Sequence, residues 1–148
     1  PKHFATVTYL VASALLAAAC ATADTKEWDA PLPKIERSTS AAALSRGAMI
    51  FRSACAGCHV DDGHAVGKRM TDFPAFMGSF YAKNITTSVT SGIGGWSDAE
   101  TKRAISQGVG RDGRKMQEPM AFAWYAGIRD EDLDAIVAYL RTLPPLAR

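Results

Sequence analysis

One short segment, Cys55-Ala56-Gly57-Cys58-His59, restricts what this chain can fold into more than any other feature. Two thiols lie three positions apart, and an imidazole follows the second thiol directly. A helical turn spaces such thiols to reach the two vinyl groups along one edge of a porphyrin, and the adjacent imidazole then falls under the central iron. This order of residues is the attachment signature of c-type haem.

Other uses of paired cysteines fit this chain less well. A structural zinc site needs four ligands, but beyond the N-terminal segment the chain has no third cysteine and, besides His59, only His64. A thioredoxin-like redox pair needs an alternating strand and helix pattern, which is not visible. One motif therefore predicts one covalently bound haem, held by Cys55 and Cys58 with His59 as an axial ligand.

The residues around the motif predict short helices joined by long loops. Helices are expected over residues 40–55, 97–107 and 130–143. In the first and last, apolar side chains recur at helical spacing, and the second is marked by its capping residues. Residues 60–96 contain several glycines and no sustained period, and no segment is a credible strand. Three short helices bury too little apolar surface for a stable core. We therefore expect an all-α fold of three or more short helices wrapped around the haem, with long loops.

Helix ends are marked by residues that cap the first turn. Ser40, Ser97 and Asp130 are the expected N-caps, and Glu100 completes a capping box with Ser97. Gly108 is expected to end the second helix. The last helix carries one apolar stripe, made of Leu133, Ile136, Val137 and Leu140.

The N-terminal residues 1–23 have the composition of a secretory signal, with an apolar run that ends in Ala21-Thr22-Ala23. The apolar run over residues 4–23 is also long enough for a membrane anchor, and Cys20 is a candidate for lipidation. Each alternative places the folded domain outside the cytoplasm, so we expect a periplasmic protein, soluble or anchored to the outer face of the inner membrane. Residues 24–39 are predicted to be a linker, and residues 40–148 the haem domain.

The second axial ligand is less constrained than the first. A methionine sulfur at this position raises the reduction potential and blocks small ligands. Met49 precedes the motif and suits packing, whereas Met70 and Met77 lie in the long loop. Met116 and Met120 come shortly before the last helix, where the chain is able to cross the opposite haem face. Spacing favours Met120, because Phe122, Trp124 and Tyr125 follow it and are able to seal the haem pocket. The other methionines remain possible ligands.

Three further segments strengthen the prediction of a haem domain. They read N-I-T at 84–86, G-I-G-G-W-S-D at 92–98 and G-V-G-R-D-G at 108–113. Together with the motif and the C-terminal helix, they resemble class I cytochrome c. More narrowly, they are similar to one haem module in the cytochrome c subunits of membrane-bound alcohol and gluconate dehydrogenases.

The resemblance covers about residues 45–145 and implies that Met120 is the second ligand. The chain departs from those subunits in carrying one haem motif where they usually carry three. Lys83 and Thr87 also stand where prolines often flank the N-I-T segment.

Four more residues are candidates for contacts with the haem. The indole N–H of Trp96 is a donor for a propionate, and Arg111 and Arg114 match the geometry of propionate carboxylates. Asn84 is a candidate for fixing the loop near the haem edge. Each has an ordinary alternative, since loop arginines are often solvated, a tryptophan packs at helix starts and asparagine favours turns.

These features predict one-electron transfer by an electron carrier, or by an electron-transfer subunit of an oxidoreductase complex, rather than an enzyme with a substrate of its own. The expected partners are a dehydrogenase, a cytochrome complex or a terminal oxidase. Three basic pairs are candidates for steering an acidic partner: Lys68-Arg69, Lys102-Arg103 and Arg114-Lys115. The alternative is a haem enzyme or gas-sensing protein with an open sixth site. The net charge of +2, without a basic face, predicts no nucleic-acid binding.

Overall fold

The structure, a computed structural model, describes residues 31–147. The predicted signal at 1–23, the alternative anchor at 4–23 and Cys20 lie outside the described residues. Within residues 31–147, no helix has both the length and the apolar character needed to cross a membrane.

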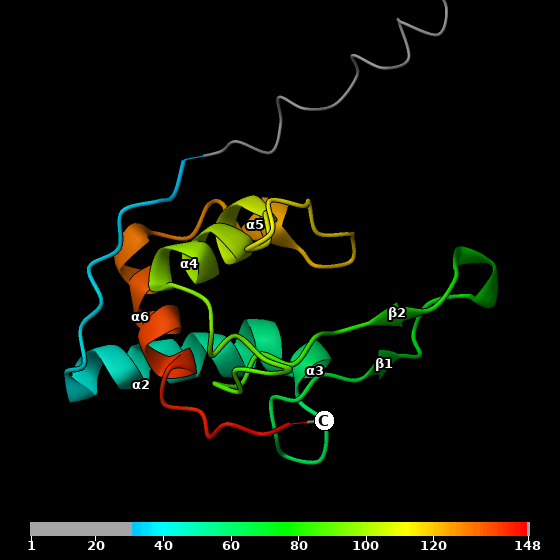
Figure 1. The fold of residues 1–148 in the computed structure, drawn as a ribbon, viewed down its shortest axis with the longest axis horizontal. Helices are drawn as coiled ribbons and strands as arrows, with labels where there is room; N and C mark the ends of the chain where they lie inside the picture. The colour runs from blue at the N-terminus through cyan, green and yellow to red at the C-terminus, as the bar shows by residue number, and fades with distance from the viewer. Residues whose placement is uncertain (1–30, 148) are drawn as a thin grey trace, which may run out of the picture. The chain divides into compact units, whose positions relative to one another are not determined.

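Helices dominate the described part of the chain and confirm the expected helical fold (Figure 1). In chain order the elements are α2 (Ala41–Ile50), the π-helical turn η1 (Phe51–Cys55), α3 (Ala56–His59), β1 (Arg69–Met70), the 3₁₀ turn η2 (Ala75–Met77), β2 (Phe80–Tyr81), α4 (Asp98–Gln107), α5 (Phe122–Tyr125) and α6 (Asp130–Leu140).

The first helical segment continues through the haem motif. The expected cap is confirmed, because the side chain of Ser40 accepts a hydrogen bond of 3.2 Å from the backbone N–H of Ala43. Helical turns then follow without a break from Ala41 to His59. Cys55 ends η1, whereas Cys58 and His59 end α3. The motif therefore lies on helical backbone, as the spacing of its thiols requires.

The crossing of α2 and α6 forms one side of the core (Figure 1). Gly47 allows the two helices to approach closely, since a Cβ at this position would lie 2.0 Å from the carbonyl oxygen of Ala135. One turn further on, the rings of Phe51 and Tyr139 pack with their centroids 5.2 Å apart. The crossing fixes the direction in which the motif helix leaves the core.

The apolar stripe predicted on the last helix is confirmed as the centre of the core. Leu133, Ile136, Val137 and Leu140 are at most 4% exposed and pack in one cluster with Phe51 and Ile105. The helix thus joins the motif segment to α4.

The helix caps were predicted with one error. Ser97 and Glu100 form the expected capping box, and Gly108 ends α4 in the left-handed conformation. Asp130, however, is the first residue of α6, and Arg129 occupies the N-cap position without a side-chain cap. The carboxylate of Asp130 lies instead 3.0 Å from the ammonium group of Lys102, so a long-range ion pair replaces the local cap.

The expectation of no strand was wrong. β1 and β2 pair as an antiparallel ladder, with Arg69 opposite Tyr81 and Met70 opposite Phe80. The hairpin projects away from the helices (Figure 1), and the rings of Phe73 and Phe80 pack against one another within it, with their centroids 5.0 Å apart. Strands of two residues are too short to show an alternating pattern in the sequence.

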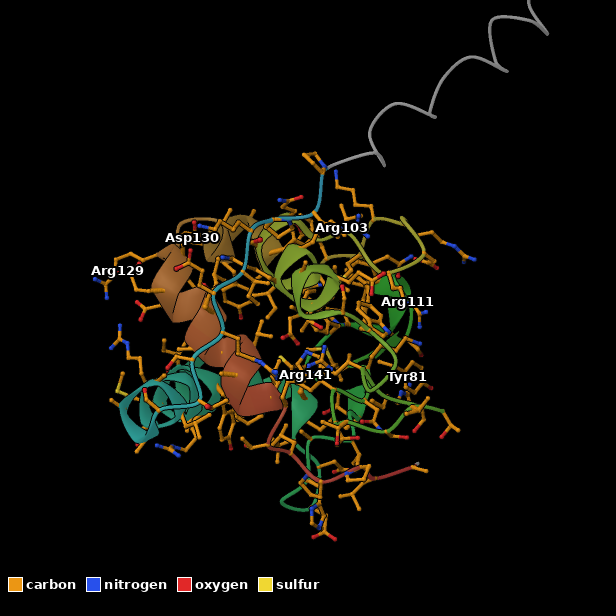
Figure 2. All side chains as sticks on the ribbon, turned by 60° about the vertical axis from the view of Figure 1, so that its left-hand side comes forward. Tyr81, Arg103, Arg111, Arg129, Asp130 and Arg141 are labelled. Carbon is orange, nitrogen blue, oxygen red and sulfur yellow. The ribbon has the colours of Figure 1, made fainter. Side chains whose placement is uncertain are left out.

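The end of the predicted linker is packed against the helices. The Lys102 ammonium donates to the carbonyl of Lys34 at 2.8 Å, and the backbone N–H of Glu36 donates to the Asp134 carboxylate at 2.9 Å. Figure 2 shows residues 31–38 running beside α6 and α4. These residues therefore belong structurally to the helical body.

Candidate haem attachment site

The two thiols of the motif are free and partly buried. Burial, and to a smaller extent the neighbouring Cys58, raises the pKa of the Cys55 thiol to about 11. Cys55 is therefore a neutral thiol near pH 7. The two sulfur atoms remain available for thioether bonds.

The ring of His59 is oriented by a hydrogen bond to the backbone. Its Nδ1 lies 2.8 Å from the carbonyl oxygen of Lys83, and since that oxygen only accepts, Nδ1 must carry the proton. Burial lowers the pKa of His59, although the bond to Lys83 opposes this in part. The neutral ring therefore keeps the lone pair of Nε2 for a metal, which is the form that ligates iron.

This donor set fits haem better than a chelated metal ion. Among residues 31–147, no three His, Cys, Asp or Glu side chains converge as a metal site. The zinc alternative thus lacks its ligands in the described part of the chain. Two free thiols on helical backbone and one imidazole with a free Nε2 are what covalent haem attachment requires.

The position of Lys83 is itself fixed by the chain around the motif. The backbone N–H of Gly67 donates to the carbonyl of His59 at 2.9 Å, and Ile85 donates to Ala65 at 3.0 Å. Gly67 lies so close to the returning chain that a Cβ would approach the carbonyl oxygen of Ala82 to 2.2 Å. Sequence reasoning did not identify this role of Lys83, because the contact uses a backbone atom.

The segment around Met120 is anchored beneath the end of α4. The ring of Phe122 packs against the backbone of Gly108. A Cβ at Gly108 would lie only 2.5 Å from the nearest ring atom. The backbone N–H of Phe122 donates to the carbonyl of Met120 at 2.8 Å, and Met120 donates to Gln117 at 3.2 Å. Met120 is therefore held in a defined turn between α4 and α5.

Tyr125 connects this segment to the motif helix. Its hydroxyl donates to the carbonyl of Ala54, next to Cys55, at 2.8 Å. Burial raises the pKa of Tyr125, with smaller contributions from Cys55 and Cys58. The structure thus brings α5, which starts two residues after Met120, to the cysteine end of the motif.

The other methionines occupy different surroundings. Met49 is 47% exposed on α2, and Met77 is 50% exposed at the tip of the projecting hairpin, which also contains Met70. Met116 is tied by its backbone N–H to the carbonyl of Gly108 at 2.6 Å. Of the candidates, Met116 and Met120 belong to the segment linked to the motif.

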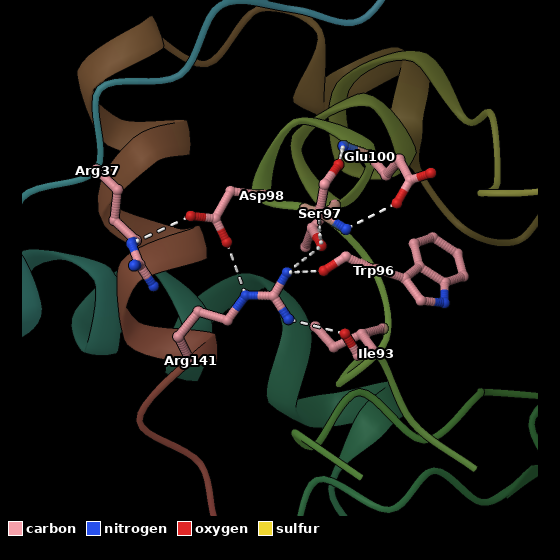
Figure 3. A network of polar contacts seen from close by, with 8 residues as sticks. Arg37, Ile93, Trp96, Ser97, Asp98, Glu100 and Arg141 are labelled. Atoms are coloured by element: carbon pink, nitrogen blue, oxygen red, sulfur yellow. Dashed lines mark hydrogen bonds and ion pairs between the residues drawn. The ribbon is translucent and has the colours of Figure 1, made fainter. Parts of the chain in front are cut away.

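Trp96 and Arg111 lie near one another, whereas Arg114 does not join them. A Cβ on Gly95 would lie 3.1 Å from the guanidinium of Arg111, which places that group beside the chain entering Trp96. The indole of Trp96 points away from Arg141, whose guanidinium donates a hydrogen bond to the Trp96 carbonyl (Figure 3). The side chain of Arg114 is 86% exposed and pairs with Asp112 at 3.2 Å.

The side chain of Asn84 is engaged within the protein. Its amide nitrogen donates to the carbonyl of Leu146 at 2.7 Å and to the hydroxyl of Ser91 at 3.2 Å. Its oxygen accepts from the backbone N–H of Thr86 at 2.8 Å. Asn84 therefore organises the loop that follows Lys83.

One of the three basic pairs is not a surface patch. Lys102 is 2% exposed and Arg103 is 8% exposed, because both side chains turn into the interior of the protein. Arg103 donates to the carbonyl of Gly110 at 2.8 Å. The prediction that this pair steers an acidic partner was wrong, because both cationic side chains of α4 lie in the protein interior.

Comparison with known proteins identifies the family. The family model for cytochrome c matches residues 44–144. A nicotinate dehydrogenase subunit from Pseudomonas putida is 38% identical over 112 residues, which cover 74% of this chain and 9% of that protein. The fructose dehydrogenase cytochrome subunit of Gluconobacter japonicus is 34% identical, over 67% of this chain and 21% of its own length.

The cytochrome c subunit of gluconate 2-dehydrogenase from Pantoea cypripedii is 30% identical over 72% of this chain and 25% of its own length. The chain thus spans a quarter or less of these three relatives. The residues that the family model matches nevertheless include the C-x-x-C-H motif, the N-I-T segment and the C-terminal helix α6. This chain belongs to the cytochrome c family, and the group implied by Cys55, Cys58 and His59 is the covalently attached haem c of that family.

Proposed function

We propose that this domain transfers single electrons through one covalently bound haem, with His59 and Met120 as axial ligands. The observation that carries the proposal is the link between the Met120 segment and the motif, made by Tyr125 and Ala54 at 2.8 Å. When bound, the haem supplies a one-electron couple between ferrous and ferric iron.

The protein's own residues perform three tasks in this proposal. Cys55 and Cys58 attach the group, while the bond from His59 to Lys83 holds the imidazole in the ligating tautomer. Met120 would hold the group together with His59 and so exclude small ligands. A fixed pair of axial ligands changes little between the two oxidation states, so little reorganisation opposes electron transfer.

We further propose that the partner is a dehydrogenase or a respiratory complex on the periplasmic side, with the domain either soluble or anchored. The names of two relatives, cytochrome subunits of fructose and gluconate dehydrogenases, support a dehydrogenase as electron donor. Exposed Arg69 and Arg114 supply positive charge for an acidic partner surface. Trp96 and Arg111 remain our candidates for propionate contacts, although the Arg111 guanidinium also lies 3.9 Å from a carboxylate oxygen of Glu100. The side chain of Arg114 pairs with Asp112, and that of Asn84 donates to the Leu146 carbonyl.

The ligand assignment is tested by Met120→Ala, with Met116→Ala as the matched control in the same segment. The ferric wild-type protein should show the weak charge-transfer band of methionine-ligated iron and bind carbon monoxide poorly. Met120→Ala should lose the band and bind carbon monoxide readily, with its covalent haem retained. Met116→Ala should behave as the wild type.

Two results would contradict the proposal. Loss of the band in Met116→Ala alone would assign the ligand to that residue. A wild-type protein that lacks the band and binds carbon monoxide at once would favour the haem enzyme or gas sensor with an open site. A potentiometric titration that follows a one-electron curve completes the test of the electron-transfer role.

A further inference from the structure

A buried polar cluster joins the loop after Lys83 to the C-terminal residues. Thr86 is 1% exposed, Ser88 is 5% exposed and Asn84 is 9% exposed. Burying polar groups stabilises a fold only if they are hydrogen-bonded. The partners of these groups therefore show what the cluster holds in place.

Three side chains of the loop, those of Asn84, Thr86 and Thr87, contact the C-terminal segment directly. The amide of Asn84 donates to the carbonyl of Leu146 at 2.7 Å, and the hydroxyl of Thr87 donates to the carbonyl of Leu143 at 2.7 Å. The hydroxyl of Thr86 lies 2.7 Å from the Asn84 oxygen and 3.1 Å from the Leu146 oxygen, and its one hydrogen serves one of them.

The loop has little space in which to shift. The backbone N–H of Ile93 donates to the carbonyl of Thr86 at 2.9 Å. A Cβ on Gly92 would approach the Thr86 carbonyl oxygen to 2.3 Å, and one on Gly94 would approach the Thr87 oxygen to 2.0 Å. The two halves of the loop are thus in direct backbone contact.

Arg141, the C-cap residue of α6, binds the second half of the same loop. The Arg141 guanidinium donates to the carbonyls of Ile93 and Trp96, each at 2.7 Å, and to the Asp98 carboxylate at 2.8 Å (Figure 3). The C-terminal segment that Thr87 and Asn84 bind begins two residues after Arg141. Loop and C-terminal segment therefore form one connected unit.

We propose that Asn84 and Thr87 are positioning residues for His59. They fasten the loop to residues 143–146 and so fix the carbonyl of Lys83, which precedes Asn84 and accepts the hydrogen bond from Nδ1 of His59. The inference rests on the proposed function only in requiring that His59 is an axial ligand. A hydrogen bond from the remote ring nitrogen makes a ligating histidine a stronger donor. A stronger donor favours ferric iron, so loosening this bond should raise the midpoint potential.

The test compares Thr87→Val with Thr142→Val in the haem-containing full chain. Both changes replace a hydroxyl that donates to a backbone carbonyl at 2.7 Å, but Thr142 is exposed and binds Tyr139 within its own turn. Solvent exchange of the His59 ring N–H, followed by NMR of the ferrous protein, should quicken by up to about tenfold in Thr87→Val, the factor for one net hydrogen bond. The midpoint potential should rise in the same variant. Thr142→Val should change neither quantity.

Asn84→Ala should shift both quantities in the same direction as Thr87→Val, and further. If that variant does not fold, Thr87→Val alone decides. Equal exchange rates and equal potentials in Thr87→Val and Thr142→Val would overturn the inference, whatever their stabilities. Failure of the electron-transfer proposal would appear differently, as a missing methionine band in the wild type.

Discussion

Asp132 shows at the residue scale how one carboxylate connects two helices. Its oxygens accept from Arg46 on α2 at 2.7 and 2.9 Å, and from Arg129 at the start of α6 at 3.0 Å. The hydrogen bonds from Arg46, followed by smaller effects of Arg129, hold the pKa of Asp132 at about 2, below its ordinary 3.8. A carboxylate whose folded pKa is depressed stabilises the protein above its unfolded pKa and loses this contribution as the pH falls.

We therefore expect Asp132 to contribute to acid unfolding between about pH 4 and pH 2. Asp132→Asn should lower the free energy of unfolding at pH 7 by about 1 kcal/mol and flatten its fall across this range. Urea unfolding at a series of pH values measures both effects. Asp72→Asn, on the exposed hairpin, is the control and should leave the profile unchanged. A variant profile as steep as that of the wild type would count against this role.

At the element scale, the crossing of α2 and α6 depends on Gly47. Alanine in its place would gain about 1 kcal/mol in helix propensity. The added Cβ, however, would lie 2.0 Å from the carbonyl oxygen of Ala135 and 2.9 Å from the Cβ of Tyr139. Neither contact is with a flexible side-chain end, so the helices would have to move apart, at a cost of about 1–3 kcal/mol or more.

We expect Gly47→Ala to lower the free energy of unfolding by about 2 kcal/mol, since overpacking exceeds the propensity gain. Gly127→Ala is the matched control, because its Cβ would meet only the Trp124 carbonyl oxygen at an ordinary 3.6 Å. Thermal unfolding of the two variants compares them. A Gly47→Ala protein as stable as the control would show that the crossing adapts without cost.

At the scale of the whole molecule, Lys102 joins the N-terminal arm to two helices. Its ammonium group binds the Lys34 carbonyl at 2.8 Å, Asp134 at 2.7 Å and Asp130 at 3.0 Å. Burial lowers the pKa of Lys102, but the bonds to Asp134 and Asp130 more than offset this, and the pKa is raised overall. The stabilisation is therefore present at neutral pH and is lost only as the pH rises through this raised value.

Lys102→Met should remove this connection while keeping the length of the side chain. Asp134 would remain buried with the Glu36 N–H as a partner, so we expect a loss of about 3 kcal/mol in the free energy of unfolding. Amide hydrogen exchange at residues 34–37 should quicken. Lys34→Met removes a side chain that is 85% exposed, keeps its carbonyl, and should change neither measurement. Unchanged exchange in Lys102→Met would show that the arm is held by other contacts.

Much of the fold and of the attachment site followed from residues that act on near neighbours. The C-x-x-C-H motif, the capping box of Ser97 and Glu100, and the apolar stripe of α6 each lie within a few turns of helix. Such patterns are legible because side chains three or four positions apart meet on one helix face.

By itself, then, the sequence determined the haem motif, the three longer helical segments and the family to which they belong, but not the short helix α5. Only the tertiary structure decided that the Lys83 carbonyl orients His59, that Lys102 is buried beside Asp134, and that residues 69–81 form a hairpin. The physical reason is that these contacts join distant segments, often through backbone atoms that every residue shares. Only folding brings the particular pair together.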